Sequence, residues 1–149
     1  NGKTTTAFLV KSILENANCK VALIGTLGLI AKGFKYQKTL TTPDPISLHK
    51  ILHNLNAVGF YHVVMEVSSH ALDQYRVSDI EFNIAAFTNI TPEHLDYHKT
   101  FENYKNAKAK LFQLLVENSK AIINIDDHFG EILSRKLSFE VIPFSRKSR

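Results

Sequence analysis

The chain has 149 residues, of which 44% are hydrophobic and 21% charged, values typical of one soluble globular domain. No apolar run reaches the length of a membrane span and no N-terminal stretch resembles a signal peptide, so we expect no membrane partner. A net charge of +4 without a basic run interleaved with aromatics argues against nucleic acid. The single cysteine, Cys19, excludes an internal disulfide and favours a reducing, cytoplasmic setting.

Helical and strand patterns alternate from the start of the chain. Residues 4–17 are predicted to form a helix and residues 20–25 a strand. Residues 27–44 are predicted to be irregular or to form a hairpin. A second helix is predicted over residues 45–58, with Asp44 as its N-cap and a proline in its first turn.

The remaining chain continues the alternation. Strands are predicted at 61–67, 82–88, 121–125 and 139–144, and helices at 101–117 and 127–136. The continuous apolar run of 61–67 predicts burial on both faces of that strand. The basic cluster 146–149 is predicted to be a solvated end. Strands separated by helices indicate an α/β fold with a mostly parallel sheet flanked by helices.

Ligands of such sheets bind outside the carboxyl ends of the strands, so the polar residues that follow each strand are candidate site residues. They lie at 25–26, 66–70, 88–89 with His94 beyond, and 124–127.

Residues 1–4 match the end of the phosphate-loop pattern, in which a glycine allows close backbone approach to phosphates. In that pattern Lys3 would reach the terminal phosphates of a nucleotide, and the Thr4 hydroxyl would bind Mg²⁺. The alternative is an ordinary helix start with a threonine cap.

Glu66 ends an otherwise apolar predicted strand, where a carboxylate is costly unless it is paired or binds a metal. Strand-end acids of phosphate-loop enzymes commonly hold Mg²⁺. A salt bridge at the rim of the sheet is the alternative. Farther along, His94 and His98 have a spacing that could form half of a zinc site on a helix. No cysteine or further histidine pair completes such a site, so solvated histidines in a polar loop are the favoured interpretation.

Lys108 lies in the middle of an apolar stripe on the helix predicted over 101–117. The stripe consists of Phe101, Tyr104, Leu111, Phe112 and Leu115. A lysine at such a position snorkels to water, or is paired or modified. Burial lowers the pKa of a lysine ammonium, and the neutral amine can react.

Taken together, these segments resemble the Mur ligase family. Residues 1–6 resemble its phosphate loop, whose usual form is Gly-Thr-Asn-Gly-Lys-Thr-Thr. Residues 65–72 with Gln74 and Arg76 are similar to the segment typical of UDP-N-acetylmuramoyl-tripeptide synthetases. The other similar blocks are 87–90 with 94–98, 104–111 and 124–127. One departure is Leu40, where the synthetases often have asparagine.

The resemblance implies roles for matching positions. ATP would contact the residues Asn1, Gly2, Lys3, Thr4, Thr5 and Asn124. Metal ligands would be Thr4 and Glu66 for one Mg²⁺, and His94 with a carbamylated Lys108 for the second. Contacts to the UDP-muramoyl peptide would come from Thr41, Thr42, Ser68, Gln74 and Arg76. The catalytic set would be Lys3, Glu66, His94 and Lys108.

The implied activity is ATP-dependent ligation through an acyl phosphate. It would add the third amino acid, meso-diaminopimelate or L-lysine, to UDP-N-acetylmuramoyl-L-alanyl-D-glutamate for peptidoglycan synthesis. Residues 1–149 would be the central domain of a monomer, without the first strand and start of the phosphate loop, and inactive without the N-terminal and C-terminal domains.

Two other interpretations remain open from the sequence. The first is another ligase on the same fold, such as a different Mur ligase or a folylpolyglutamate synthetase. The second is a nucleotide-binding module without catalytic activity.

Overall fold

A computed structural model describes residues 1–34 and 39–147. The chain divides into two compact units, one formed by Gly2–Val77 and the other by Asn1 with Ser78–Arg149. Among the described residues, each unit contains a three-stranded sheet, and all strand pairs but one are parallel. The predicted α/β class with mostly parallel pairing is therefore confirmed, with the strands distributed over two sheets. Part of the segment predicted as hairpin (35–38) and the end of the basic cluster (148–149) lie outside the described residues.

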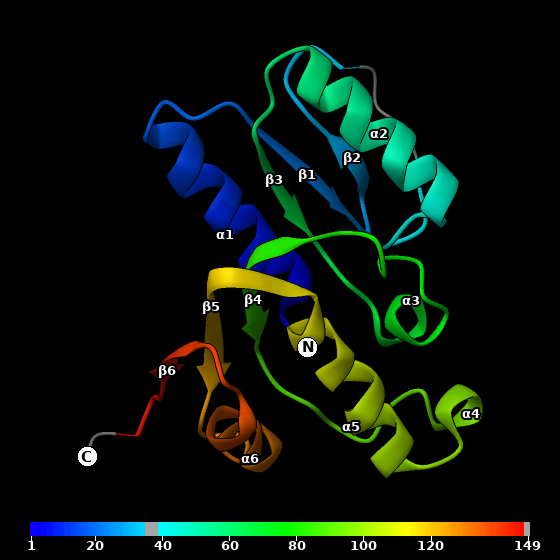
Figure 1. Cartoon of the computed structure of the whole chain (residues 1–149), viewed down its shortest axis with the longest axis vertical. Coiled ribbons are helices and arrows are strands. Elements are labelled where there is room, and N and C mark those ends of the chain that lie inside the picture. Colours follow the sequence, from blue (N-terminus) through cyan, green and yellow to red (C-terminus); the bar gives the residue numbers. More distant parts are fainter. Residues whose placement is uncertain (35–38, 148–149) are drawn as a thin grey trace. The chain divides into compact units, whose positions relative to one another are not determined.

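The unit Gly2–Val77 has a sheet with strand order β2-β1-β3. Its strands are β1 (Val21–Gly25), β2 (Gly28–Ile30) and β3 (His62–Met65). β1 occupies the middle, and all five of its residues are buried. Helix α1 (Lys3–Asn16) lies against β1 and β3 (Figure 1). The first predicted helix and strand are thus confirmed to within a residue or two.

The segment after β1 turns back as a hairpin. Gly25 pairs with Gly28, and Gly28 has a φ of 87° that suits the tight turn. Helix α2 (Pro45–Ala57) begins as predicted, because the Asp44 carboxylate accepts a hydrogen bond from the Ser47 N–H at 3.0 Å. The Ser47 hydroxyl first, and this N–H bond second, hold the pKa of Asp44 below its usual value. A short helix, α3 (Ser69–Asp73), follows β3 and was not predicted.

The burial predicted for both faces of the strand at 61–67, which is β3 in the structure, is wrong. His62 is exposed, and Val63, Val64 and Met65 are only half-buried. The reason is position, because β3 is the edge strand of its unit's sheet and β1 takes the central place. An apolar run alone does not distinguish the two places.

The other unit contains a fully parallel sheet with the order β4-β5-β6. Its strands are β4 (Phe82–Phe87), β5 (Leu115–Asn124) and β6 (Glu140–Phe144). Helix α6 (His128–Lys136) confirms the helix predicted over 127–136, and the Asp127 carboxylate caps it. The buried core of this unit consists of Ala85, Phe87, Phe112, Leu115, Ala121, Ile123 and Leu133.

The helix predicted over 101–117 is too long. α5 covers Phe101–Ala109, a 3₁₀ turn η1 covers Lys110–Leu114, and β5 already begins at Leu115. Leu115 pairs with Phe82 of β4, so it cannot continue the helix. A second short helix, α4 (Leu95–His98), was not predicted as an element.

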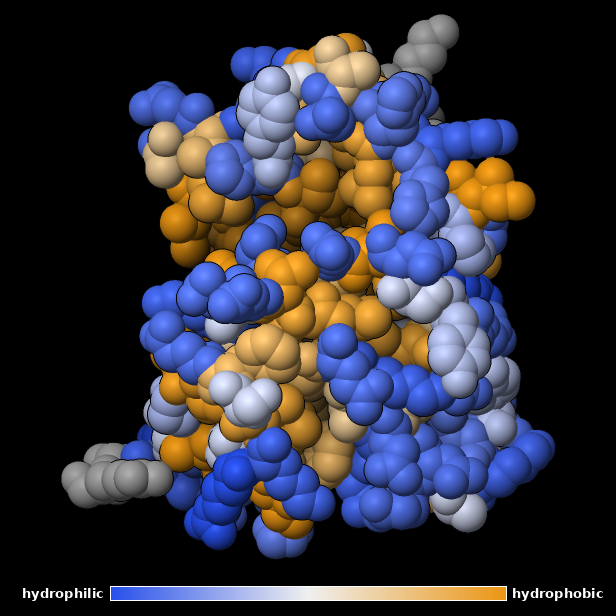
Figure 2. All heavy atoms as spheres, viewed as in Figure 1, coloured by the Kyte–Doolittle hydropathy of each residue, from blue (hydrophilic) through white to orange (hydrophobic). Residues whose placement is uncertain are grey.

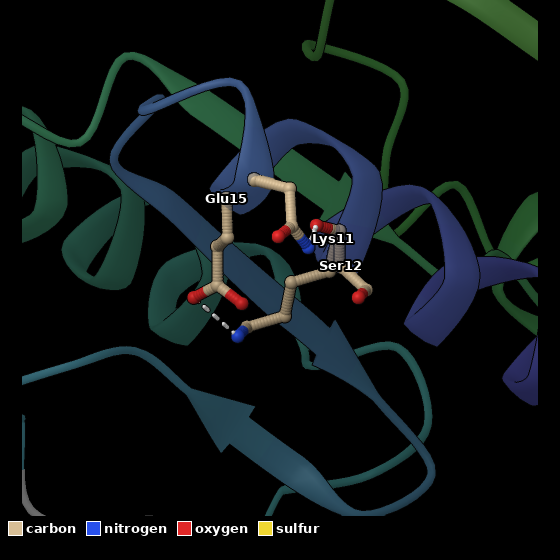
Figure 3. Close-up of polar contacts among 4 residues, drawn as sticks. Lys11, Ser12 and Glu15 are labelled. Atoms are coloured by element: carbon tan, nitrogen blue, oxygen red, sulfur yellow. Dashed lines mark hydrogen bonds and ion pairs between the residues drawn. The ribbon is translucent and has the colours of Figure 1, made fainter.

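Exposed apolar side chains lie among polar ones on the surface, as Figure 2 shows for one face. Described examples are Leu9 and Ile13 of α1. On the same helix, Lys11 and Glu15 form an ion pair at 2.6 Å, with Ser12 beside them (Figure 3). Within residues 1–34 and 39–147, no helix combines the length and the hydropathy needed to cross a membrane.

Candidate functional site

Gly2 is the N-cap of helix α1 and has a left-handed conformation, with φ of 81°. Its carbonyl accepts the Thr6 N–H at 2.9 Å, and in the described part of the chain no side chain caps this helix. The alternative of a threonine-capped start is therefore wrong. The first backbone N–H groups of a helix carry partial positive charge, and here Lys3 adds a full charge beside them. This end of α1 suits an anion.

Glu66, directly after β3, is 3% exposed. Its Oε2 accepts the Thr4 hydroxyl at 2.7 Å, and its Oε1 accepts the Thr26 N–H at 3.0 Å. The Thr26 hydroxyl also donates to Oε2 at 3.3 Å. Among the described residues, these partners are hydroxyl and amide groups instead of the cation of a rim salt bridge. A buried carboxylate held by neutral donors keeps its charge available for a cation.

Gly25 makes room for this carboxylate. A Cβ at position 25 would lie 2.2 Å from Glu66 Oε1 and 2.8 Å from Glu66 Cδ. No heavier residue fits beside Glu66 as it stands. Gly25 and Thr26 were noted in the sequence only as residues after a strand, and nothing in the sequence alone links them to Glu66.

We expect Gly25→Ala to lower divalent-cation affinity roughly tenfold, the scale seen when groups supporting a metal ligand are lost. The added methyl must push the Glu66 carboxylate away. Titration of the full-length protein with Mn²⁺ measures the effect. Gly33→Ala is the control, because it strains a left-handed backbone without meeting any atom of the described residues within 4 Å. A folded Gly25→Ala protein with unchanged Mn²⁺ affinity contradicts this role.

The predicted substrate residues are joined to Glu66 by hydrogen bonds. The Thr42 hydroxyl, 1% exposed, donates to the Glu66 carbonyl at 3.0 Å and accepts the Ser68 N–H at 3.1 Å. Arg76 Nη1 donates to the Thr42 carbonyl at 3.1 Å, and Arg76 Nε donates to Gln74 Oε1 at 2.9 Å. The structure therefore brings these residues into one connected group.

Thr41 joins this group through Thr26, since the two hydroxyl oxygens are 3.3 Å apart. Ser68 has a second contact, because its hydroxyl accepts the Ala71 N–H at 3.1 Å and caps α3. The segment between β3 and α3 is thus ordered by its own side chains.

In the other unit, Asn1 lies at the end of β4. Its carbonyl accepts the Thr88 hydroxyl and the Asn89 side-chain amide, both at 2.9 Å. Asn1 Nδ2 donates to Glu93 Oε1 at 3.2 Å. The Thr91 hydroxyl first, and the Asn1 amide second, hold the pKa of Glu93 below its usual value.

His94 and Lys108 both lie close to Tyr104. His94 has a left-handed φ of 58° at the start of α4, and its ring centroid is 5.9 Å from that of Tyr104. Lys108 Nζ lies 5.0 Å from the Tyr104 ring centroid. Burial, followed by the negative charge of Glu93, raises the pKa of Tyr104. The two residues predicted to bind the second Mg²⁺ thus share one aromatic neighbour.

The stripe around Lys108 is only partly buried. Tyr104, Phe112 and Leu115 are buried, whereas Phe101, Leu111 and Lys108 are half-buried. Lys108 is therefore not enclosed, and its amine lies over an aromatic face.

His98 is 5% exposed and its ring lies 4.8 Å from Tyr97, so it is not the solvated histidine of a polar loop. Within the described ranges, no three His, Cys, Asp or Glu side chains form a group that could hold a metal ion.

Asn124 is the last residue of β5, and its side chain forms hydrogen bonds to the segments that follow β4 and β5. Its Nδ2 donates to the Thr88 carbonyl at 2.7 Å, and its Oδ1 accepts the Asp126 N–H at 3.0 Å. Nearby, Asp127 Oδ2 accepts the Ile90 N–H at 2.8 Å. The ends of β4 and β5 are thus cross-linked by polar side chains.

The fold is of the α/β class, and these polar groups follow the carboxyl ends of parallel strands, where such folds bind their ligands. The family model described as the Mur ligase middle domain matches residues 1–149, and the chain belongs to this family. The resemblance expected from the sequence is confirmed.

Individual relatives agree. The chain is 44% identical over 147 residues to the UDP-N-acetylmuramoyl-L-alanyl-D-glutamate--2,6-diaminopimelate ligase of Clostridium tetani, covering 99% of this chain and 30% of that protein. The ligase of the same name from Aquifex aeolicus is also 44% identical over 147 residues, with the same coverage.

A solved structure of a protein with that name matches with a TM-score of 0.87 and 30% identity, covering 100% of this chain and 31% of that one. The chain thus spans about three tenths of the length of these relatives.

Proposed function

We propose that this chain is the ATP-binding part of a ligase that joins 2,6-diaminopimelate to UDP-N-acetylmuramoyl-L-alanyl-D-glutamate in peptidoglycan precursor synthesis. The observation that carries the proposal is the 2.7 Å pair of Thr4 hydroxyl and buried Glu66 carboxylate, at the start of a helix that no described side chain caps. The names of the relatives supply the substrates. Both ATP and a UDP-linked substrate suit the cytoplasm.

The donor set around Thr4 fits Mg²⁺, which prefers oxygen ligands and commonly uses one or two carboxylates together with phosphate oxygens and water. Thr4 and Glu66 would hold the ion, and Gly2, Lys3 and Thr5 would contact the phosphates. Bound there, Mg²⁺ would neutralise charge on the transferring phosphoryl group. Thr26 and Gly25 keep the carboxylate in place for that purpose.

In the unit that includes Ser78–Arg149, we assign His94 and Lys108 to a second Mg²⁺. A bare lysine ammonium repels a cation, so this assignment requires Lys108 as its carbamate. The half-buried position of Lys108 leaves the amine reachable by carbon dioxide. Asn1 and Asn124 would lie on the nucleotide side.

The reaction begins with transfer of the γ-phosphoryl group to a glutamyl carboxylate. The amine of the incoming amino acid then attacks the acyl phosphate carbon, and phosphate leaves from the tetrahedral intermediate. Lys3 would place a positive charge near the phosphoryl oxygens, where charge develops. Thr41, Thr42, Ser68, Gln74 and Arg76 would orient the muramoyl peptide so that its carboxylate is in line.

Arg76→Ala is expected to weaken binding of the UDP-muramoyl dipeptide at least tenfold, roughly the effect of losing one charged hydrogen bond. ATP binding should change by less than about twofold. Arg76 also braces the Thr42 carbonyl and Gln74, so its loss loosens the proposed substrate segment. Calorimetric titration of the full-length protein with each ligand measures both constants. Arg135→Ala, which removes an exposed arginine paired with Glu131, is the control. A larger effect on ATP than on the dipeptide contradicts the assignment.

The activity itself is tested by incubating the full-length protein with the UDP-muramoyl dipeptide, ATP, Mg²⁺ and one amino acid at a time. We expect the UDP-muramoyl tripeptide and ADP with meso-diaminopimelate. Product with L-lysine alone would revise the amino acid, product only with another acceptor would indicate a different ligase of this fold, and no product with any would favour a non-catalytic nucleotide-binding module.

A further inference from the structure

Thr26 contacts both Glu66 and Thr41 in the unit Gly2–Val77. Its hydroxyl lies 3.3 Å from Glu66 Oε2 and 3.3 Å from the Thr41 hydroxyl oxygen. Its backbone N–H is bound separately to Glu66 Oε1. One short side chain therefore links the carboxylate proposed for Mg²⁺ to a threonine proposed for the muramoyl peptide.

The number of protons in this chain of hydroxyls determines its direction. A hydroxyl has one proton to donate, and an ionised carboxylate can only accept. When the Thr26 proton is given to Glu66, the contact between the two threonines must use the Thr41 proton. Thr41 then points its proton inward, toward Thr26, and offers only lone pairs to a ligand.

Neutralising the charge of Glu66 reverses this preference. A carboxylate whose charge is compensated is a weaker acceptor, so the Thr26 proton is released and can be given to Thr41 instead. The Thr41 proton becomes available to an acceptor oxygen of the substrate, such as a carbonyl or a carboxylate. The 3.3 Å contact between the two hydroxyls permits either direction.

We propose that Thr26 is a positioning residue that couples divalent-cation binding at Glu66 to binding of a substrate acceptor oxygen at Thr41. This inference rests on the proposed function. Binding of the cation raises the affinity for the substrate, because it sets the direction in which the two hydroxyls donate. Thermodynamic linkage requires substrate binding to raise the affinity for the cation by the same factor. Thr26 acts through Glu66 and Thr41 and touches neither phosphate nor reacting carbon.

The test is calorimetric titration of the full-length protein with UDP-muramoyl dipeptide, without and with saturating Mg²⁺. In the unaltered protein we expect Mg²⁺ to lower the Kd about fivefold or more, a typical size for coupling between sites. Thr26→Val keeps the shape and the N–H bond to Glu66 but loses the hydroxyl, and its Kd should respond to Mg²⁺ less than twofold. Thr26→Ser keeps the hydroxyl and should retain the response.

The outcomes separate this inference from the proposed function. A Thr26→Val protein that binds the dipeptide and keeps the full Mg²⁺ response overturns the coupling role alone. Loss of the response in Thr26→Ser as well overturns it too, since the hydroxyl would then not be the cause. An unaltered protein that binds the dipeptide but shows no Mg²⁺ response has the same meaning. Failure of the unaltered protein to bind the dipeptide at all overturns the proposed function, and this inference with it.

Discussion

Replacing Lys3 by alanine in the full-length protein is expected to lower the kcat of ATP-dependent ligation about 10²–10³-fold, the usual loss when one group that stabilises developing charge is removed. Lys3 is the first residue of α1, beside backbone N–H groups that no side chain caps among the described residues. A cation at this end of a helix opposes the helix dipole. The position of the Lys3 charge is therefore unfavourable for the stability of the helix, but the combined positive charge suits a bound anion.

The same argument separates catalysis from folding. Because Lys3→Ala removes a positive charge from a positive helix end, the melting temperature should stay the same or rise slightly. Lys11→Ala on the same helix is the matched control, since Lys11 is paired with Glu15 at 2.6 Å and should be dispensable for turnover. Steady-state kinetics and thermal unfolding of the three proteins give the comparison. A folded Lys3→Ala enzyme with unchanged ATP turnover would refute the phosphate role.

Lys108→Ala is expected to lower ligation about 10²-fold or more, with melting temperature little changed. The neutral Lys108 amine would form an N–C bond to carbon dioxide as one C=O π bond opens, and the nitrogen would release a proton to solvent. The product carries a negative charge and two oxygens, which suit Mg²⁺. His94 and Lys108 both lie against Tyr104, so the carbamate would form beside the other proposed ligand.

Two further measurements distinguish a carbamate from an ordinary lysine. Added acetate should restore part of the activity of Lys108→Ala by supplying a short carboxylate, and labelled ¹³C-bicarbonate should give a carbamate signal in the unaltered enzyme but not in the variant. Lys105→Ala is the control, because Lys105 is paired with Glu102 at 2.6 Å and has no proposed role. A fully active Lys108→Ala enzyme without a carbamate signal in its parent would end this assignment.

Local signals in the sequence predicted much of the fold. The Asp44 cap with its proline and the alternation of strands with helices depend on residues close together in the chain, and both appear in the structure. The end of α5 could not be predicted in this way. Residues 110–117 continue the helical pattern, but the pairing of Leu115 with Phe82 draws the chain into β5.

The candidate site was likewise only partly predictable from the sequence. Resemblance pointed to Thr4, Glu66, Thr42 and Arg76, and their side chains join one hydrogen-bonded group in the structure. The contributions of Gly25 and Thr26 depend on where β1 lies beside β3, and that adjacency is a tertiary property. No spacing along the chain relates Thr26 to a carboxylate forty residues away.

Transfer of oxygen from the substrate to phosphate tests the central claim most directly. The UDP-muramoyl dipeptide is prepared with ¹⁸O in its glutamyl carboxylates and incubated with the full-length protein, ATP, Mg²⁺ and meso-diaminopimelate. If the carboxylate is activated as an acyl phosphate, its oxygen leaves with the phosphoryl group, and mass spectrometry should find one ¹⁸O in each inorganic phosphate released. Phosphate without ¹⁸O alongside tripeptide product, or no tripeptide at all, would contradict the account.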